Sequence, residues 1–201
     1  NYELDGLAGR NAGIFNILVG GDEQPMEMQT TADENGRYSV PIDLAQFADG
    51  DIKIEITQQD KAGNTSPVMT KTLTKDTIAP TAVVLDQQPT MFNGNMVDYS
   101  LTGKSEPNIT LDILLSDDST TSTHTVKTDE DGNFDLTFDG SPFVDGEIDV
   151  SIVATDVAGN RTEASSHTIM KDTVIPTEVD VNHPTYVNRE NSSDFIITGV
   201  S

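Results

Sequence analysis

The fold of this chain is decided by one short stretch, Glu147-Ile148-Asp149-Val150-Ser151-Ile152-Val153-Ala154-Thr155. Its apolar side chains occupy every second position from Ile148 to Ala154, and the positions between them are polar apart from Val153. Because successive side chains of a β-strand point to opposite faces, this alternation predicts a strand that buries one face. The earlier stretch Asp51-Ile52-Lys53-Ile54-Glu55-Ile56-Thr57 repeats the alternation with the same parity and predicts the same strand in a preceding copy.

The two copies are separated by one fixed offset of 96 residues. Four short blocks return at this offset without a gap: Asp33–Gly36 as Asp129–Gly132, Asp49-Gly50 as Asp145-Gly146, Asp60–Asn64 as Asp156–Asn160, and Lys75–Thr81 as Lys171–Thr177. A period near a hundred residues is too long for a solenoid repeat and is typical of a complete small domain. The sequence therefore predicts a tandem array of separate domains.

Short alternating runs separated by Gly, Asn, Asp and Pro continue along the whole chain, with no helical period. In the second copy they predict seven strands, at residues 82–85, 96–103, 109–115, 123–128, 134–138, 147–155 and 163–170. Seven strands joined by turns at roughly ten-residue spacing are typical of a two-sheet Greek-key sandwich. The fold class is therefore all-β, with tandem immunoglobulin-like Greek-key β-sandwiches of about 96 residues per repeat.

The boundaries of the repeats follow from a block that forms the second predicted strand of each repeat. Tyr2–Gly6 aligns with Tyr99–Gly103, one residue away from the 96-residue step, and Phe195–Gly199 matches the same block. We therefore expect residues 1–75 to be an immunoglobulin-like repeat without its first strand and residues 76–171 to be a complete repeat. Residues 172–201 are expected to supply the first two strands of a third repeat, so that the chain is an internal piece of something longer.

The composition restricts the direct partners. With 34 acidic and 11 basic side chains the formal charge is -23, which excludes nucleic acid and anionic membrane surfaces. No apolar stretch approaches the ~20 residues of a membrane span, so direct membrane insertion is also excluded. Cations are the natural partners of such a surface, because they reduce its self-repulsion. Adaptation to high salt is the alternative explanation of the charge.

The absence of cysteine restricts the chemistry further. Disulfide bonds and thiolate metal sites are excluded, so any metal must be bound through oxygen. Oxygen ligands on carboxylate-rich loops favour hard cations, and calcium tolerates irregular, high-coordination geometry better than magnesium does. Ca²⁺ is therefore the expected cofactor.

Three motifs in this order carry a resemblance to a known family. They are Asp-x-Ala-Gly-Asn at residues 60–64 and 156–160, Lys-Asp-Thr-x-x-Pro-Thr at 75–81 and 171–177, and Gly103-Lys104-Ser105-Glu106-Pro107. Together they resemble the bacterial immunoglobulin-like repeats of giant, calcium-binding surface adhesins. The resemblance implies type I secretion, an extracellular location at the bacterial cell surface, and calcium between neighbouring domains. The first repeat departs from it, because Gly6-Leu7-Ala8-Gly9-Arg10 has no carboxylate at this position.

The candidate metal ligands are acidic residues of the loops at the junctions between consecutive domains. In an immunoglobulin-type sandwich the loops after the second, fourth and sixth strands gather where the chain enters, and the loop after the fifth strand lies where the chain leaves. Carboxylates that converge there repel one another unless a cation lies among them. The predicted calcium ligands are Asp49, Asp60, Asp76, Glu106, Asp145, Asp156 and Asp172.

Several acidic or Asn-Gly positions of these loops also have a structural interpretation that needs no metal. Asp131-Gly132 and Asn35-Gly36 are strong turn formers, because glycine accepts the positive φ that tight turns require. Asp156 can hydrogen-bond backbone amides of its own loop, and Asp76 can cap the segment that links two domains. Both interpretations stay open at the level of sequence.

The expected function is that of a structural extender: a spacer segment of a large bacterial cell-surface adhesin, rigidified by calcium at interdomain junctions. Its partners would be neighbouring repeats of the same chain, with a host-surface or biofilm-matrix component bound through other domains. The alternatives are a module that binds host glycan or protein directly and an accessory domain of a secreted polysaccharide-degrading enzyme. Aromatic residues make up only 5% of the chain, which favours the spacer over a binding platform. Catalysis is not expected, because no apolar pocket surrounds the acidic turns.

Overall fold

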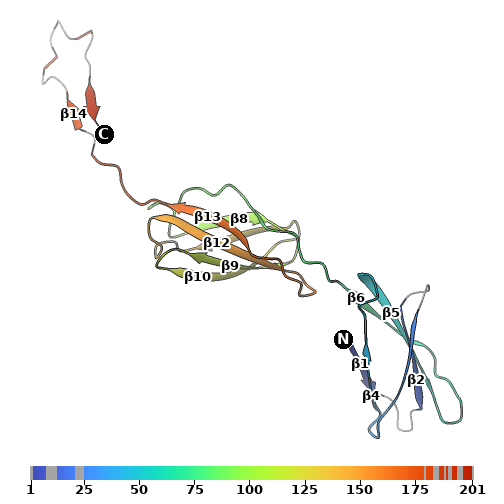
Figure 1. Cartoon of the computed structure of the whole chain (residues 1–201). Helices are drawn as coiled ribbons and strands as arrows, with labels where there is room; N and C mark the ends of the chain where they lie inside the picture. The colour runs from blue at the N-terminus through green and yellow to red at the C-terminus, as the bar shows by residue number, and fades with distance from the viewer. Residues whose placement is uncertain are drawn as a thin grey trace. The chain divides into compact units, whose positions relative to one another are not determined.

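The computed structural model describes residues 2–7, 13–20, 25–178, 180–182, 186–187, 189, 192–193 and 197–200. The chain divides into two compact units, residues 1–79 with Ala158–Asn160, and residues 80–157 with 161–201 (Figure 1). Every element in the described residues is a strand, which confirms the all-β prediction. No helix in this part of the chain is long and apolar enough to cross a membrane.

The second unit contains a complete two-sheet sandwich. Its four-stranded sheet has the order β10-β9-β12-β13, with β10 at Thr121–Lys127, β9 at Thr110–Ser116, β12 at Gly146–Thr155 and β13 at Ser165–Lys171. The other sheet has the order β11-β8-β7, with β11 at Asn133–Phe138, β8 at Tyr99–Lys104 and β7 at Val84–Leu85. All of these pairings are antiparallel. The predicted immunoglobulin-like sandwich is confirmed.

All seven predicted strands are present, with small differences at their ends. The strand predicted to begin at residue 96 begins instead at Tyr99, because a turn precedes it. In that turn the backbone amides of Asn95 and Met96 both donate to the carbonyl oxygen of Phe92 at 3.0 Å. The fourth strand, β10, pairs with β9 and therefore belongs to the four-stranded sheet.

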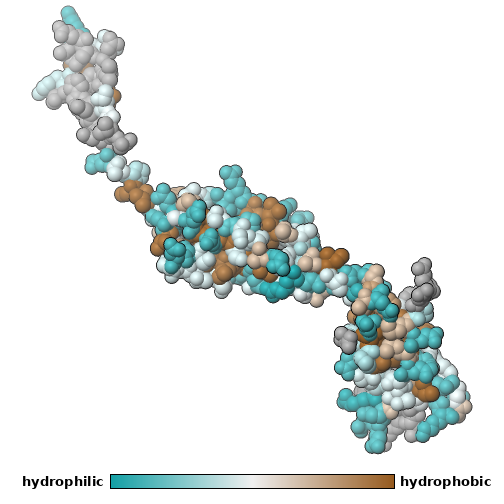
Figure 2. Space-filling model, viewed as in Figure 1, coloured by the Kyte–Doolittle hydropathy of each residue, from teal (hydrophilic) through white to brown (hydrophobic). Residues whose placement is uncertain are grey.

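The core is formed by the alternate apolar side chains that the sequence predicts to point inward. Ile148, Val150, Ile152 and Ala154 of β12 are all buried. The same buried cluster contains Leu111, Ile113 and Leu115 of the neighbouring strand β9, and Tyr99, Leu101, Phe134, Leu136 and Phe138 of the other sheet. Full burial of an aliphatic side chain contributes roughly 1.5–3 kcal/mol, so this interior accounts for much of the stability of the sandwich. Outside it, Figure 2 shows hydrophilic and hydrophobic residues mixed over the visible face of the unit.

The first unit repeats this plan. Its four-stranded sheet has the order β3-β2-β5-β6, with β3 at Met26–Thr31, β2 at Ile14–Val19, β5 at Gly50–Gln59 and β6 at Met69–Lys75. Its second sheet pairs β1 (Tyr2–Leu7) with β4 (Arg37–Ile42). The predicted inward residues Ile52, Ile54 and Ile56 are buried. β4, β5 and β6 lie 96 residues before β11, β12 and β13, and β1 lies 97 before β8, as the sequence alignment predicts.

The last described strands pair with each other. β14 (Asp180–Asn182) is antiparallel to β15 (Thr198–Val200), and Asp180 opposes Val200 as Val84 opposes Lys104 in the second unit. The alignment that predicted these strands also used Phe195 and Ile196, which lie outside the described residues. The domain limits 1–75, 76–171 and 172–201 stay a prediction.

Replacement of one core residue should test how much the buried side chains of β12 contribute to stability. Ile152→Ala removes a buried side chain of β12 and should lower the free energy of unfolding of the second unit by about 2–5 kcal/mol. The matched control is Val157→Ala, because Val157 is 90% exposed and its truncation should change stability by no more than about 0.5 kcal/mol. Hydrogen exchange of β12 amides in the full chain measures both values. Equal effects of the two changes would contradict the assignment of the core.

Candidate functional site

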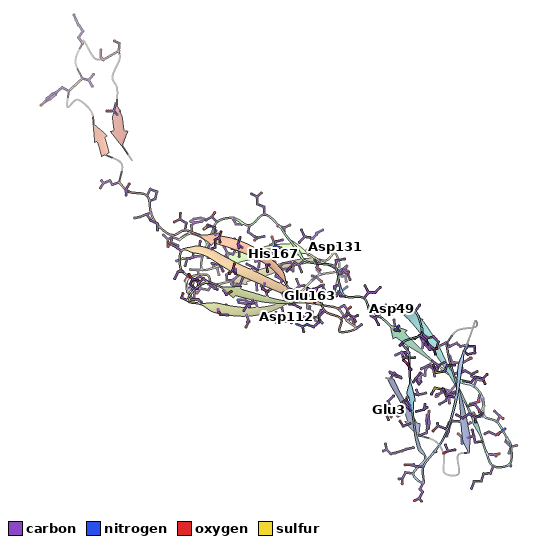
Figure 3. All side chains as sticks on the ribbon, in the orientation of Figure 1. Glu3, Asp49, Asp112, Asp131, Glu163 and His167 are labelled. Atoms are coloured by element: carbon purple, nitrogen blue, oxygen red, sulfur yellow. The ribbon has the colours of Figure 1, made fainter. Side chains whose placement is uncertain are left out.

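The loops at one end of the second unit converge as the sequence predicts. The amide of Ser105 donates to the carbonyl oxygen of Gly132 at 2.9 Å, and the hydroxyl of Thr128 donates to the carbonyl oxygen of Glu106 at 2.6 Å. These bonds join the β8–β9 loop to the β10–β11 loop, which contains Asp131 (Figure 3). Since Thr155 at the end of β12 opposes Thr110, the β12–β13 loop begins at the same end.

Glu106 holds the chain where it enters the second unit. Its Oε1 accepts the backbone amide of Thr81 at 2.8 Å, while the hydroxyl of Ser105 donates to the carbonyl oxygen of Thr81 at 3.0 Å. Thr81 is the last residue of the Lys-Asp-Thr-x-x-Pro-Thr motif. One function of the Ser-Glu pair is therefore to fix the first residues of the domain, with or without a metal.

Asp49 and Asp145 perform the same task in the two copies, where the chain leaves each sandwich. Asp49, labelled in Figure 3, accepts the backbone amide of Thr77 at 3.0 Å and the Thr77 hydroxyl at 2.9 Å. Asp145 accepts the amide of Thr173 at 3.1 Å and its hydroxyl at 2.9 Å. The hydrogen bond from the Thr77 amide, supported by the Thr77 hydroxyl and the nearby Lys75, holds the pKa of Asp49 below its ordinary value.

Asp76 and Asp172 cap the segment that follows the last strand of each copy. Oδ1 of Asp76 accepts the backbone amide of Ile78 at 3.0 Å, and Oδ1 of Asp172 accepts that of Val174 at the same distance. A side chain that binds the amide two residues ahead forms an Asx turn. The capping interpretation of Asp76 is thus confirmed, and the second carboxylate oxygen leaves room for the metal interpretation.

Asp60 closes the loop between β5 and β6. Its Oδ1 accepts the amides of Ala62 and Asn64 at 2.9 and 2.8 Å, and its Oδ2 accepts the side-chain amide of Asn64 at 2.8 Å. The side-chain hydrogen bond from Asn64 is the first cause that lowers the pKa of Asp60. Asp156 begins the equivalent loop of the second copy and is not without a partner either.

The Asp-Gly and Asn-Gly blocks are turns, as one of the two interpretations predicts. Gly36 and Gly132 have φ values of 77° and 80°, a region that favours glycine. Asp129 accepts the backbone amides of Asp131 and Asn133 at 2.9 and 2.8 Å. The side-chain amide of Asn133 is the first cause that holds the pKa of Asp129 below its ordinary value.

The predicted ligands are therefore oxygen donors of the right chemistry, each already engaged in a local hydrogen bond or contact. Within the described residues, no group of three or more acidic or histidine side chains is assembled to hold a metal ion. The first repeat lacks the Ser-Glu-Pro part of the Gly-x-Ser-Glu-Pro motif and has Ala8–Arg10 in its place. These three residues lie outside the described residues. Calcium ligation by the seven predicted residues accordingly stays a prediction.

Sequence reasoning missed the lysine that begins the repeated motif. Lys171 is only 5% exposed, and its ammonium donates to the carbonyl oxygens of Gly140 at 3.1 Å, Ser141 at 3.3 Å and Phe143. In the first copy Lys75 donates to the carbonyl oxygen of Phe47 at 2.6 Å. The signal was available, because Phe-x-Asp-Gly recurs at residues 47–50 and 143–146, at the same offset as the lysines.

The lysine and the aspartate–threonine pair form one repeated device, which we call the exit clamp. It consists of Lys75, Thr77 and Asp49 in the first copy and of Lys171, Thr173 and Asp145 in the second. Each clamp ties the end of the last strand, and the two residues after it, to the loop that precedes β5 or β12. The direction in which the chain leaves each sandwich is therefore fixed by hydrogen bonds.

The sequence of the complete copy belongs to a known family. Residues 80–171 match the family described as bacterial Ig domain. The second sandwich is a bacterial Ig domain. Curated proteins give no match to the chain.

Several solved structures are similar to the chain at low identity. A tetra-tandem repeat in the extending region of a large adhesion protein is 24% identical, with a TM-score of 0.46, over 91% of this chain and 48% of that one. A 1.5-MDa bacterial ice-binding adhesin is 18% identical, with a TM-score of 0.43, over 91% and 62%. Fibronectin(III)-like modules of Clostridium thermocellum CbhA are 13% identical, with a TM-score of 0.44, over 85% and 86%. The chain spans about half the length of the first, and likenesses this distant carry no statement about function.

Removal of the clamp lysine should destabilise the bacterial Ig domain. Lys171→Met keeps an unbranched side chain but leaves the carbonyl groups of Gly140, Ser141 and Phe143 without their donor. We expect a loss of about 1–3 kcal/mol in the free energy of unfolding, measured by hydrogen exchange of β13 amides in the full chain. Lys127→Met, on the exposed edge strand β10, is the matched control and should change little. If both variants retain the stability of the parent, the stabilising role assigned to Lys171 is wrong.

The lowered pKa of Asp49 predicts a dependence on pH. A folded pKa below the unfolded value of about 3.9 means that the carboxylate stabilises the fold above that value and loses its contribution as the pH falls through the folded pKa. Asp49→Asn should therefore be less stable than the parent at pH 7, and the difference should shrink between about pH 5 and pH 2. Urea unfolding at several pH values, followed by circular dichroism, measures this difference. The matched control is Glu34→Gln, because Glu34 is exposed on a turn, and this variant should be as stable as the parent at pH 7.

Proposed function

We propose that this chain is a structural extender segment of a large bacterial cell-surface adhesin. The observation that carries the proposal is the repetition of one bacterial Ig plan along the chain. β1 to β6 of the first unit correspond in order to β8 to β13 of the second, and the exit clamp recurs with them. The extending-region repeat described above has the same kind of role, but the proposal rests on the repetition in this chain.

Repetition of the same loops favours a spacer over a binding module. A specific ligand site would more naturally be present in one copy, whereas the acidic motifs recur in both. The chain has no tryptophan and few other aromatic residues, so it has little of the surface that binds sugars by stacking. Adhesion to a host-surface or biofilm-matrix component then belongs to other domains of the protein, and the segment itself performs no catalysis.

We further propose that calcium rigidifies the junctions between domains. The support is chemical: the formal charge is -23, every available ligand is an oxygen donor, and carboxylates recur at the ends of the domains. Calcium accepts six to eight oxygen ligands at irregular angles, and weak extracellular sites have dissociation constants of roughly 10⁻⁴ to 10⁻³ M. Such sites fill outside the cell, which is consistent with a secreted protein exported by type I secretion.

Small-angle scattering of the full chain tests both parts of the proposal. A spacer should keep its domains apart, with a maximum dimension of at least roughly 85 Å, the length of two ten-residue strands and a six-residue linker at about 3.3 Å per residue. Millimolar calcium should narrow the distribution of lengths towards its upper limit, relative to a chelator. A compact particle in both conditions would contradict the extender role. An extended particle that does not respond to calcium would contradict the rigidification alone.

Paired variants identify the ligands. Asp76→Asn combined with Glu106→Gln should raise the calcium concentration at the midpoint of the scattering change by about tenfold or more, since two charged ligands are lost. The control removes two charges elsewhere, with Asp98→Asn and Asp118→Asn, both on exposed loops of the second unit. If the control shifts the midpoint as far as the paired variant, the effect is one of net charge and the assignment of the ligands is wrong.

A further inference from the structure

The chain contains two Asn-Gly pairs, at residues 35–36 and 93–94. In such a pair the side-chain amide carbon of asparagine can reach the backbone nitrogen of the next residue, and glycine has no Cβ to hinder their approach. Asparagine is among the residues that are chemically labile for this reason. Whether a pair reacts in the folded protein therefore depends on what the fold does with the nitrogen of the glycine.

The first pair is held by the turn that contains it. The amide of Gly36 closes the turn by donating to the carbonyl oxygen of Asp33 at 3.0 Å. Oδ1 of Asp33 also accepts the backbone amides of Asn35 and Arg37, both at 2.8 Å. The nitrogen of Gly36 is thus engaged in a hydrogen bond, which must be broken before this nitrogen can react.

The second pair occupies an earlier position in its turn. This turn runs from Phe92 to Asn95 and is closed by the amide of Asn95, which donates to the carbonyl oxygen of Phe92 at 3.0 Å. Gly94 is the third residue of the turn, and in the described part of the chain its amide donates to no acceptor. Asn93 and Gly94 are both exposed, so water and hydroxide reach the Gly94 amide directly.

The side chain of Asn93 holds the segment that leaves the second unit. Its Nδ2 donates to the carbonyl oxygen of Thr173 at 3.1 Å. Thr173 is the threonine of the exit clamp, where its amide and hydroxyl bind Asp145. Asn93 therefore attaches the same residue to the turn that precedes β8. A carboxylate in place of the Asn93 amide could not donate this bond, because an ionised carboxylate only accepts hydrogen bonds.

We propose that Asn93-Gly94 is a site of spontaneous modification that releases the exit segment from this turn. The Gly94 nitrogen loses its proton to hydroxide and attacks Cγ of Asn93. An N–C bond forms, the Cγ–Nδ2 bond breaks, and ammonia leaves after taking a proton from water, which regenerates hydroxide. Water then opens the five-membered imide at either carbonyl and gives aspartate or isoaspartate. One water is consumed and one ammonia is released, without an oxidant, a reductant or an enzyme.

The product differs from asparagine in charge and in hydrogen bonding. A carboxylate at this position faces the carbonyl oxygen of Thr173, which is itself an acceptor, so repulsion replaces the hydrogen bond. Isoaspartate also adds a methylene group to the backbone of the turn. Asp145 and Lys171 then hold the exit segment without the contribution of Asn93. The modification acts as a slow loosening of one end of the bacterial Ig domain, set by the age of the protein.

Incubation of the full chain in alkaline buffer, followed by peptide mass spectrometry, tests the chemistry. Conversion of the amide to a carboxyl group should be at least about threefold faster at Asn93 than at Asn35, since the Gly36 amide must first lose its hydrogen bond. Aspartate and isoaspartate should both form. In concentrated urea, where neither turn persists, the two rates should converge. The proposal is overturned by an unmodified Asn93, by a rate at Asn35 that equals or exceeds that at Asn93, or by a difference that urea leaves unchanged.

Two variants test the consequence for the exit segment. Asn93→Asp reproduces the loss of the donor, and hydrogen exchange of the Thr173 amide in the full chain should become about twofold to tenfold faster. The matched control is Val97→Asp, which adds the same charge at a side chain that is 56% exposed in the segment between β7 and β8. The control should leave this exchange unchanged. Exchange in Asn93→Asp that equals that of the parent, or an equal effect of both variants, would overturn the release of the segment.

Discussion

The structure depends on the burial of one face of the long inner strand of each four-stranded sheet, β5 in the first unit and β12 in the second. β12 pairs with β9 on one side and with β13 on the other, and its Ile148 and Ile152 are inaccessible to solvent. A slip of one residue would turn every one of its side chains to the opposite face, so the buried parity fixes the register of both neighbours. Once that register is set, the loops at the two ends of the strand have fixed positions, and the acidic residues on them are brought to the ends of the sandwich.

The exit clamp extends this order beyond the last strand. An ammonium group removed from water is costly unless hydrogen-bond acceptors replace the water, and three carbonyl oxygens do so for Lys171. Asp145 then binds the amide and hydroxyl of Thr173, two residues further along the chain. The segment that leaves the domain is therefore attached to the domain's own loop. In a spacer, such an attachment passes a pulling force from the linker into the sheet, so the clamp suits the proposed role before any metal is considered.

The sequence predicts the strands and the core well because both follow from the local alternation of apolar and polar residues. Burial of the apolar side chains then stabilises the same strands. It predicts the interactions of the acidic residues less well, since a carboxylate does not reveal its donors. Asp49 binds Thr77, 28 residues away, and no periodicity connects the two. The lysines were missed for a similar reason: a charged residue at the end of a strand is usually exposed, and only the fold brings carbonyl groups around Lys171. The shared 96-residue offset of Phe-x-Asp-Gly and Lys-Asp-Thr was the one signal that could have joined them.

Two copies of one domain in a single chain also act as controls for each other. The exit clamp is present in both, so it belongs to the repeat itself. In the second sandwich residues 81–91 lie across the opening between the sheets, and Tyr99 is buried beneath them. A high negative charge opposes contact between copies at low ionic strength. Contact between copies is then favoured only where salt or bound cations reduce that repulsion, so the ions that the acidic loops attract also decide how closely two copies can approach.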